Sequence, residues 1–291
     1  MGQQNQNNIQ WFPGHMAKTE RMISKYLPLV DVVIELRDAR IPFSSANPDI
    51  SRLCGRKKRV ILLNKADYAD ENITARWIEY FAGRGTQAFA ADCKSGKGLN
   101  KLFAAVTAAL SDELERRKAK GMAGQPIRMM VVGIPNVGKS SFINRVASGK
   151  RTRAEDRPGV TRGIQWVDAG TGFELLDMPG ILWHKFDDQT IGERLAFTGA
   201  VKDQILDVEY LAMRLLELLK EEYPQRLTER YRIDPEEYAD GYDLLEGVAR
   251  ARGMLMSGGR LNTERAAGAV LDEFRGGMLG RITLETPPKG V

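Results

Sequence analysis

Residues 133–140 read GIPNVGKS and match G-x-x-x-x-G-K-[ST], a loop pattern that holds the phosphates of a nucleotide. The loop follows the apolar run RMMVV and precedes SSFINRVAS, which supplies the strand and the helix that this pattern requires. Its glycines let backbone N–H groups face the phosphates, catalytic Lys139 neutralises phosphate oxygens, and the Ser140 hydroxyl binds Mg²⁺. The expected nucleotide contacts are Asn136, Val137, Gly138, Lys139, Ser140 and Ser141.

Two downstream motifs fit the same phosphate site. Residues 177–180 read DMPG and match D-x-x-G, in which Asp177 holds Mg²⁺ through water while Pro179 and Gly180 lie against the γ-phosphate. Thr161 lies in a polar stretch before the next apolar run, where a catalytic switch threonine that binds Mg²⁺ is expected. Each motif alone is weak, and Thr161 alone would be an ordinary turn residue. The interpretation therefore depends on their occurring together.

A base-recognition motif lies earlier in the chain. Residues 64–67 read NKAD, the pattern N-K-x-D, directly after the apolar run RVILL. The Asp67 carboxylate can accept hydrogen bonds from N1–H and the N2 amino group of guanine, whereas adenine has no such pair of donors. Lys65 is expected along the plane of the base, and Asn64 between this loop and the phosphate loop. The sequence thus predicts binding of GTP and GDP, against the alternative of a loop that reads NKAD by chance.

The order of the motifs indicates the fold. The base motif precedes the phosphate loop, whereas ordinary GTPases have the phosphate loop first and the base motif fourth. Circular permutation explains this order, because a basic linker over 115–127 can join the usual last helix to the usual first strand. We expect an α/β fold, a circularly permuted P-loop GTPase domain with a six-stranded, mostly parallel sheet. The predicted strands are 31–36, 59–63, 87–91, 128–133, 164–168 and 173–177.

The turn that backs the guanine is harder to find in this sequence. The run QAFAAD leads into ADCKS at residues 91–95, where GTPases have a short S-A-K-like turn. The match is poor, so Asp92 and Cys93 are candidates only.

From about residue 203 the pattern changes to helices alone, which predicts a GTPase domain over 1–200 and a small all-α domain over 201–291. Residues 1–200 carry 30 Lys and Arg against 21 Asp and Glu, a net charge of +9, whereas residues 201–291 carry 13 against 17. The basic first part favours a polyanionic partner, although solvated surface lysines are the alternative. Six arginines near the end are available for RNA phosphates: Arg250, Arg252, Arg260, Arg265, Arg275 and Arg281.

Composition excludes several other classes of protein. No apolar run approaches the ~20 residues that a membrane helix needs. The chain begins without a secretory or mitochondrial targeting pattern, and Cys54 and Cys93 do not form a C-x-x-C zinc or redox motif. We therefore expect a cytoplasmic protein with no membrane partner.

Three further segments carry a family resemblance. Residues 11–18 (WFPGHMAK), 38–42 (DARIP) and 280–287 (GRITLETP), together with the permuted motifs, make residues 10 to 286 closely resemble the ribosome biogenesis GTPase A family. The resemblance implies a cytoplasmic GTPase that assists late maturation of the large ribosomal subunit. It implies GTP or GDP, the large-subunit precursor and its ribosomal RNA as partners, with the helical domain binding the RNA. We expect a monomer.

The sequence also bears on hydrolysis. Ile181 occupies the position of the glutamine that orients water in Ras-like enzymes, so unassisted turnover should be slow. The resemblance suggests His15 as a catalytic group, while capping a helix or touching RNA is the alternative role. His184 departs from the proline that is commoner in the family, so a shared catalytic role for it is not expected. Similar GTPases use K⁺ beside the phosphates, and the Asn136 carboxamide is the candidate K⁺ ligand.

Two functions remain open at this point. The leading hypothesis is an enzymatic switch that docks on a pre-ribosomal particle and leaves after hydrolysis. The alternative is a GTP-gated RNA-binding scaffold in which hydrolysis is incidental. A permuted GTPase of the small subunit does not fit, because the cysteines for its zinc-binding insert are absent from this sequence.

Overall fold

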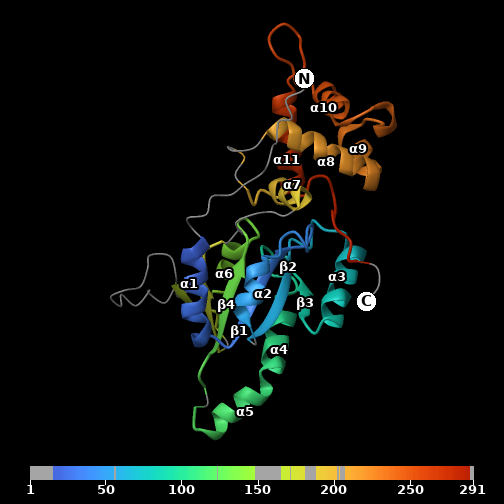
Figure 1. Cartoon of the computed structure of the whole chain (residues 1–291). Coiled ribbons are helices and arrows are strands. Elements are labelled where there is room, and N and C mark those ends of the chain that lie inside the picture. The colour runs from blue at the N-terminus through green and yellow to red at the C-terminus, as the bar shows by residue number, and fades with distance from the viewer. Residues whose placement is uncertain are drawn as a thin grey trace.

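A computed structural model describes residues 16–55, 57–122, 124–147, 165–170, 172–180, 188–201, 203 and 207–288. Its six strands form one sheet in the order β3-β2-β1-β4-β6-β5 (Figure 1). Neighbouring strands are parallel except for β5 and β6, which are antiparallel. This confirms the predicted mostly parallel sheet. The strands are β1 (Val32–Asp38), β2 (Lys58–Asn64), β3 (Gln87–Ala90), β4 (Ile127–Gly133), β5 (Gln165–Asp168) and β6 (Phe173–Asp177).

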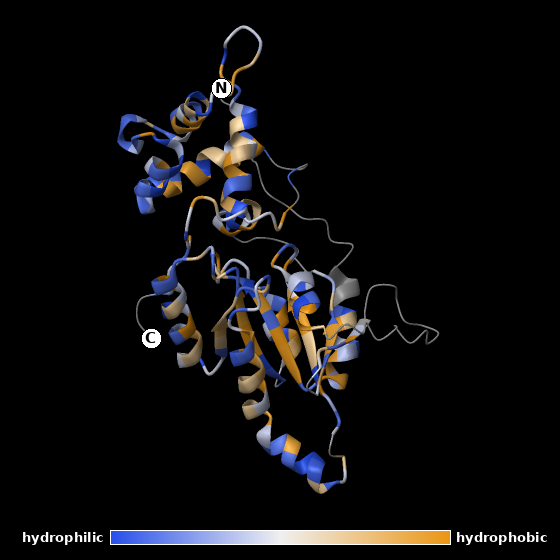
Figure 2. Cartoon of the chain, turned by 180° about the vertical axis from the view of Figure 1, so that it is seen from behind, coloured by the Kyte–Doolittle hydropathy of each residue, from blue (hydrophilic) through white to orange (hydrophobic). Residues whose placement is uncertain are grey.

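Helices cover both faces of the sheet, so the strands form the apolar middle layer of a three-layer domain (Figure 2). Val33 of β1 and Met130 of β4 pack against α1 and α2, whereas Ile34 and Val131 of the same two strands belong to the core beneath α4 and α6. Trp77 of α3 packs against β2 on the α1 and α2 side. These helices are α1 (Met16–Tyr26), α2 (Pro48–Cys54), α3 (Glu71–Gly83), α4 (Leu99–Ala109) and α6 (Lys139–Val146).

The second part of the chain is helical, and the described residues after 203 include no strand, as predicted. The Asn262 side chain accepts from Arg265 N at 2.9 Å and so caps the N-terminus of α11. Helix α8 packs against α10 and α11, and α7 packs against α8 and α11. The helices are α7 (Gln189–Phe197), α8 (Val208–Glu222), α9 (Pro224–Tyr231), α10 (Gly241–Ala251) and α11 (Thr263–Arg275), with short 3-10 turns at Leu27–Leu29 and Pro235–Glu237. No helix within the described ranges has the length and apolar character needed to cross a membrane.

The predicted linker over 115–127 is wrong in its first part. Residues up to 119 belong to helix α5 (Ser111–Ala119), which extends away from the sheet (Figure 1). Acidic residues in its first turn and basic residues in its last turn complement the helix dipole, so a segment with little apolar content is still helical. Arg117 also pairs with Asp31 at the start of β1. Only the chain after α5 makes the connection to β4.

The end of the chain returns to the sheet domain. We call residues 280–288 the C-terminal segment. Ile282 N donates to Tyr68 O at 2.9 Å and Leu284 N donates to Arg40 O at 2.8 Å. Trp77 Nε1 of α3 donates to Glu285 O at 2.8 Å. The last described residues therefore hold the helical part against the loops that leave β1 and β2.

Candidate guanine-nucleotide site

The phosphate loop runs from the end of β4 into α6 and curls around the Lys139 ammonium group. Lys139 Nζ donates to the carbonyl oxygens of Gly133 and Ile134, both at 3.1 Å. Gly138 has φ +101, and a Cβ built on it would lie 2.2 Å from Asn64 Nδ2. A glycine is required here both by backbone conformation and by the close approach of the Asn64 side chain. Ser140 is exposed at the start of α6, while Val137 is buried.

Two opposite charges meet at the phosphate end of the sheet. Burial lowers the pKa of Lys139 to about 8, although the nearby Asp177 carboxylate opposes this shift. Burial likewise raises the pKa of Asp177, which Lys139 opposes. Both side chains are thus partly desolvated, and each charged form would be stabilised by a counter-charge such as a phosphate or a cation.

The D-x-x-G segment lies directly against the phosphate loop. A Cβ built at Gly180 would lie 3.1 Å from Lys139 Nζ and 3.1 Å from the backbone of Pro135. Pro179 and Gly180 are exposed, and Asp177 ends β6 beside β4. The structure therefore brings residues 177–180 and the phosphate loop together, as the motifs predict.

Asn64 bridges three segments from the end of β2. Its Nδ2 donates to Val137 O in the phosphate loop at 2.7 Å, and its Oδ1 accepts from Cys93 N at 3.0 Å. The Asn64 side chain is buried. One carboxamide thus fixes the base-recognition loop, the phosphate loop and the turn after β3 relative to one another.

The rest of the base-recognition loop is less buried than Asn64, because Lys65 and Ala66 are half-buried. Asp67 is exposed, and its pKa is raised by burial and by the neighbouring Asp92. Burial opposes the shift at Asp92, but hydrogen bonds from Ser95 and Lys94 lower its pKa. Two carboxylates that repel each other favour a ligand with N–H donors at this edge.

Cys93 contributes through its backbone rather than its thiol. The side chain is buried in the main core, and burial raises the pKa of the thiol to about 12. Its N–H is occupied by Asn64 Oδ1. The candidate role of Cys93 is therefore to support the loop.

Two expected site residues, His15 and Thr161, lie outside the described part of the chain. Ile181 and His184, which were not expected to act in catalysis, also lie outside it. Among the residues that the structure does describe, no cluster of three or more His, Cys, Asp or Glu side chains could hold a metal ion. Next to the phosphate loop, the Ser140 hydroxyl and the Asp177 carboxylate are oxygen donors of the kind that Mg²⁺ binds together with water and phosphate oxygens.

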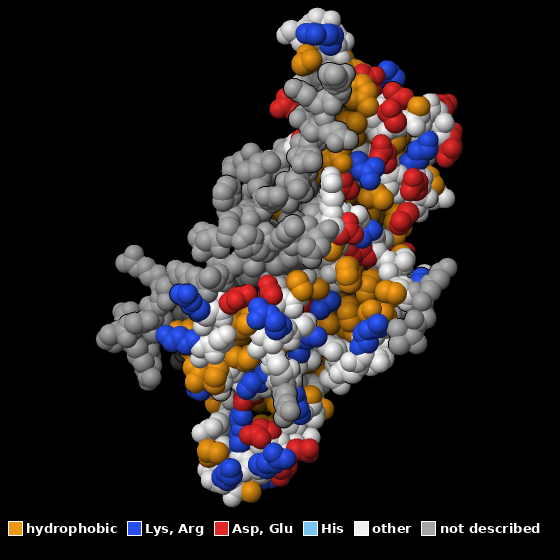
Figure 3. Space-filling view, in the orientation of Figure 1, with side chains coloured by type: hydrophobic (Ala, Val, Ile, Leu, Met, Phe, Trp, Pro, Cys, Tyr) orange, Lys and Arg blue, Asp and Glu red, His pale blue; other side chains and the backbone are white. Residues whose placement is uncertain are grey.

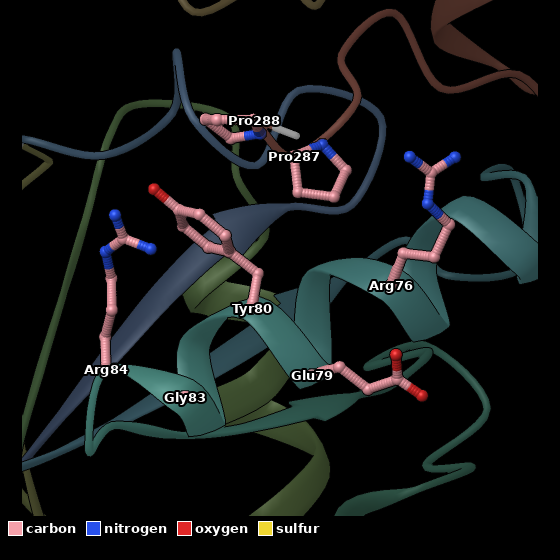
Figure 4. A pocket seen from close by; sticks show the side chains of 7 residues that line it. All are labelled: Arg76, Glu79, Tyr80, Gly83, Arg84, Pro287 and Pro288. Carbon is pink, nitrogen blue, oxygen red and sulfur yellow. The ribbon is translucent and has the colours of Figure 1, made fainter. Parts of the chain in front are cut away.

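A separate hollow of about 300 Å³ lies on α3. Figure 4 shows Tyr80 and Arg84 on one side and Pro287 of the C-terminal segment above the helix. None of the nucleotide motifs lines it. Its lining residues are Arg76, Glu79, Tyr80, Gly83, Arg84, Pro287 and Pro288.

The motifs do not predict the contacts of three polar groups next to the site: the Asp38 carboxylate, the Arg40 guanidinium and the Gly199 carbonyl group. Lys65 Nζ donates to Asp38 Oδ2 at 2.9 Å, and Asp38 is also bound by Arg40. On the phosphate side, Asn136 Nδ2 donates to Gly199 O just beyond α7. The one feature of the sequence that points to these contacts is the DARIP segment at residues 38–42. It has Asp38 and Arg40 two residues apart where β1 ends, next to the nucleotide motifs.

These features define a P-loop GTPase with a circularly permuted order of motifs. A family model described as 50S ribosome-binding GTPase matches residues 128–231. The match begins at β4, before the phosphate loop, and leaves out the base motif at 64–67, as the permutation requires.

Whole-chain relatives identify the family. Ribosome biogenesis GTPase A of Bacillus cereus is 46% identical over 281 residues, which cover 96% of this chain and 94% of the relative. The Thermotoga maritima protein of the same name is 31% identical, covering 96% and 95%. The chain belongs to the ribosome biogenesis GTPase A family.

Solved structures agree with this assignment. GDP-bound YlqF of T. maritima is 28% identical, covers 92% of this chain and 99% of its own, and superposes with a TM-score of 0.66. YlqF from the same organism with bound GNP gives a TM-score of 0.64 over 93% of this chain.

Proposed function

We propose that the chain is a GTP-dependent switch in late assembly of the large ribosomal subunit. Membership of the family makes it a GTPase. The observation that carries the proposal is the Asn64 side chain, which joins the phosphate loop to the base-recognition loop. A site that holds both ends of a guanine nucleotide in one fixed geometry is what a nucleotide switch requires.

The chain's own residues would divide the work at the phosphates. Lys139 would give its ammonium group to phosphate oxygens in place of the two carbonyl groups that it now contacts. The Ser140 hydroxyl, Asp177 and Thr161 would hold Mg²⁺, which supplies positive charge to the developing phosphate transition state. Pro179 and Gly180 would form the wall beside the γ-phosphate.

At the base, Asp67 would accept from the guanine edge, and Lys65 would lie along the ring. The loop residues Asn136 to Ser141 would contact the phosphates, with Asp92 and Cys93 in the turn behind the base. This proposal extends to the present chain the GDP-bound state named for its structural relative.

Two groups are proposed to assist hydrolysis, since Ile181 cannot orient water. The first is His15, the last residue of the WFPGH sequence at residues 11–15. The second is K⁺ bound by the Asn136 carboxamide oxygen. The amide nitrogen of Asn136 donates to Gly199 O, so the oxygen is the atom of this carboxamide that would bind the cation.

We further propose a GTPase domain over 1–200 and a helical RNA-binding domain over 201–291, in a cytoplasmic monomer. The six arginines near the end differ in their surroundings, however. Arg252 pairs with Glu273, Arg275 with Asp203, and Arg281 with Glu71. Acidic and basic side chains are interspersed over the visible face of the helical part (Figure 3).

The other three arginines, Arg250, Arg260 and Arg265, form no ion pair with any residue that the structure describes. They are exposed, and they are the better candidates for RNA phosphates. Replacing all three with Gln should weaken binding to large-subunit particles. It should also make the slope of the logarithm of the binding constant against the logarithm of salt concentration less steep, by the amount expected for about two to three phosphate contacts. Arg281→Gln is the matched control, because its charge is already paired with Glu71.

The experiment that tests the switch is GTP turnover with and without large-subunit precursor particles. A switch requires strong stimulation by the particle and tighter particle binding with GTP than with GDP. Unstimulated turnover, with particle binding that still depends on GTP, would support the RNA-binding scaffold instead.

A further inference from the structure

Arg40, in the DARIP segment after β1, is a buried cation next to the nucleotide site. Only 1% of its surface is exposed. Its Nε and Nη2 donate to the two carboxylate oxygens of Asp38 at 2.9 and 2.8 Å. Its Nη1 donates to the carbonyl oxygen of Phe274, at the end of α11, at 2.8 Å. The guanidinium has its donors on three separate nitrogens and so reaches Asp38 and Phe274 O together, whereas the three donors of an ammonium group all lie on one nitrogen.

Asp38 connects Arg40 to the base-recognition loop. Lys65 Nζ donates to the same Asp38 Oδ2 that Arg40 contacts. Burial alone would raise the pKa of Asp38, but Arg40 and Lys65 hold it well below the usual value. The carboxylate is therefore ionised and fixes both cations.

Lys65 needs this support because its backbone is in an uncommon conformation. Its φ is +60, in the left-handed region that few residues other than glycine adopt. Asp38 anchors the side chain of Lys65 on the sheet side of the loop. Asp38 thus fixes the position of the Lys65 side chain, which the proposed function places along the plane of the guanine ring.

The end of α11 lies directly against the same loop. The carbonyl groups there form the negative end of the helix dipole, which favours the Arg40 cation. Gly277, two residues beyond α11, has φ +74, and a Cβ built on it would lie 2.4 Å from Cδ1 of Tyr68. Tyr68 directly follows Asp67. A displacement of α11 would therefore disturb Arg40 and the base loop together.

We propose that Arg40 is a positioning residue for guanine-nucleotide binding, which links the end of α11 to Lys65 through the shared Asp38 carboxylate. The proposal rests on the function proposed above for Lys65 and Asp67. According to this proposal, nucleotide affinity depends on the position of α11 relative to Arg40. The competing explanation is that Arg40 only stabilises the fold as a buried ion pair.

A double-mutant cycle separates these two roles. We would measure the Kd for GDP, and unfolding in urea, for the full chain and for Arg40→Lys, Lys65→Ala and the double variant. Arg40→Lys keeps a charge beside Asp38 but cannot also reach α11, so the Kd should rise about tenfold. In the Lys65→Ala background the same change should add little, because its effect passes through Lys65. Additive effects on Kd would overturn the proposal.

Arg37→Lys is the matched control. Arg37 is a buried arginine of β1 that donates to Glu35 at 2.8 Å and to Pro42 O at 3.2 Å. The Arg37→Lys variant should have a lower free energy of unfolding but an unchanged Kd for GDP. An equal rise in Kd for Arg37→Lys and Arg40→Lys would assign the effect to general destabilisation and refute the proposal.

Asp38→Asn gives a second test should Arg40→Lys fail to fold. This change keeps the shape of the side chain but removes the negative charge that Arg40 and Lys65 both contact. The Kd for GDP should again rise in the otherwise wild-type protein but change little in the Lys65→Ala background. A protein that binds GDP and ADP equally well would overturn the guanine site itself. Normal preference for GDP, with unchanged affinity in the Arg40 and Asp38 variants, would overturn only the present inference.

Discussion

Replacing Asn64 with Ala tests whether the bridge between the two nucleotide loops is functional. The change removes the donor to Val137 O and the acceptor for Cys93 N, and both hydrogen bonds are buried. A buried backbone group that loses its partner costs ~1–3 kcal/mol. With two such groups, and partial relaxation of the loops, the free energy of unfolding should fall by ~2–4 kcal/mol. Misplacement of the loops should raise the Kd for GDP by at least about tenfold, or ~1.4 kcal/mol.

Asn47 provides the control for this measurement. Asn64 and Asn47 are both 3% exposed. The Asn47 side chain accepts from Asp49 N at 2.9 Å as the N-cap of α2 and contacts neither nucleotide loop through a hydrogen bond. Asn47→Ala should cost ~1 kcal/mol of stability and leave GDP affinity unchanged in equilibrium titrations. Wild-type affinity in a destabilised Asn64→Ala protein would refute the reasoning.

Four other predictions concern the site and its surroundings. Asp67→Asn should weaken GTP binding and reduce the preference over ATP, because an amide opposes one guanine N–H; an unchanged preference in competition titrations would contradict the role of Asp67. In the nucleotide-free protein the pKa of Lys139 is about 8, and a bound phosphate favours the charged form. Lys139 loses its charge between pH 7 and 9, so GTP affinity should fall about tenfold over that range. Persistence of that slope in Lys139→Arg would assign the titration to another group. His15→Ala should lower particle-stimulated turnover at unchanged nucleotide affinity, whereas normal turnover with failed docking would make His15 a binding residue. Glu285→Ala should lower the free energy of unfolding by ~2–4 kcal/mol because Phe43 N and Ser44 N lose their acceptor; exposed Thr286→Ala is its control.

The sheet could be predicted because each strand is a short apolar run between polar segments. The predicted strand over 31–36 stops before two charged residues, Arg37 and Asp38, which in fact continue β1. Both are buried and each has a partner of opposite charge, Glu35 for Arg37 and Arg40 for Asp38. Local patterning treats a charge as the end of a buried strand, and only the tertiary partner makes its burial acceptable.

The nucleotide loops were also predictable, since their chemistry is carried by short motifs. Their supporting contacts were not. Arg40 and Phe274 are separated by 234 positions, and Trp77 and Glu285 by 208. Spacing rules act over a few residues, so they cannot pair groups that meet only after the whole chain has folded. The segment GRITLETP could be associated with a family, but its physical role appears only in its contacts with the loops after β1 and β2.

These distant contacts connect the end of α11 to both halves of the nucleotide site. On the base side, Arg40 joins Phe274 to the loop that holds Lys65. On the phosphate side, Arg275 donates to the carbonyl oxygens at the end of α7, and Asn136 of the phosphate loop reaches the residue two positions beyond that helix. Helix α7 follows the D-x-x-G segment in the chain and contacts α11, so we expect a movement at the γ-phosphate to reach α11 through α7. Guanine and γ-phosphate would thus act on the same element, so either loop could bias the seating of the helical domain.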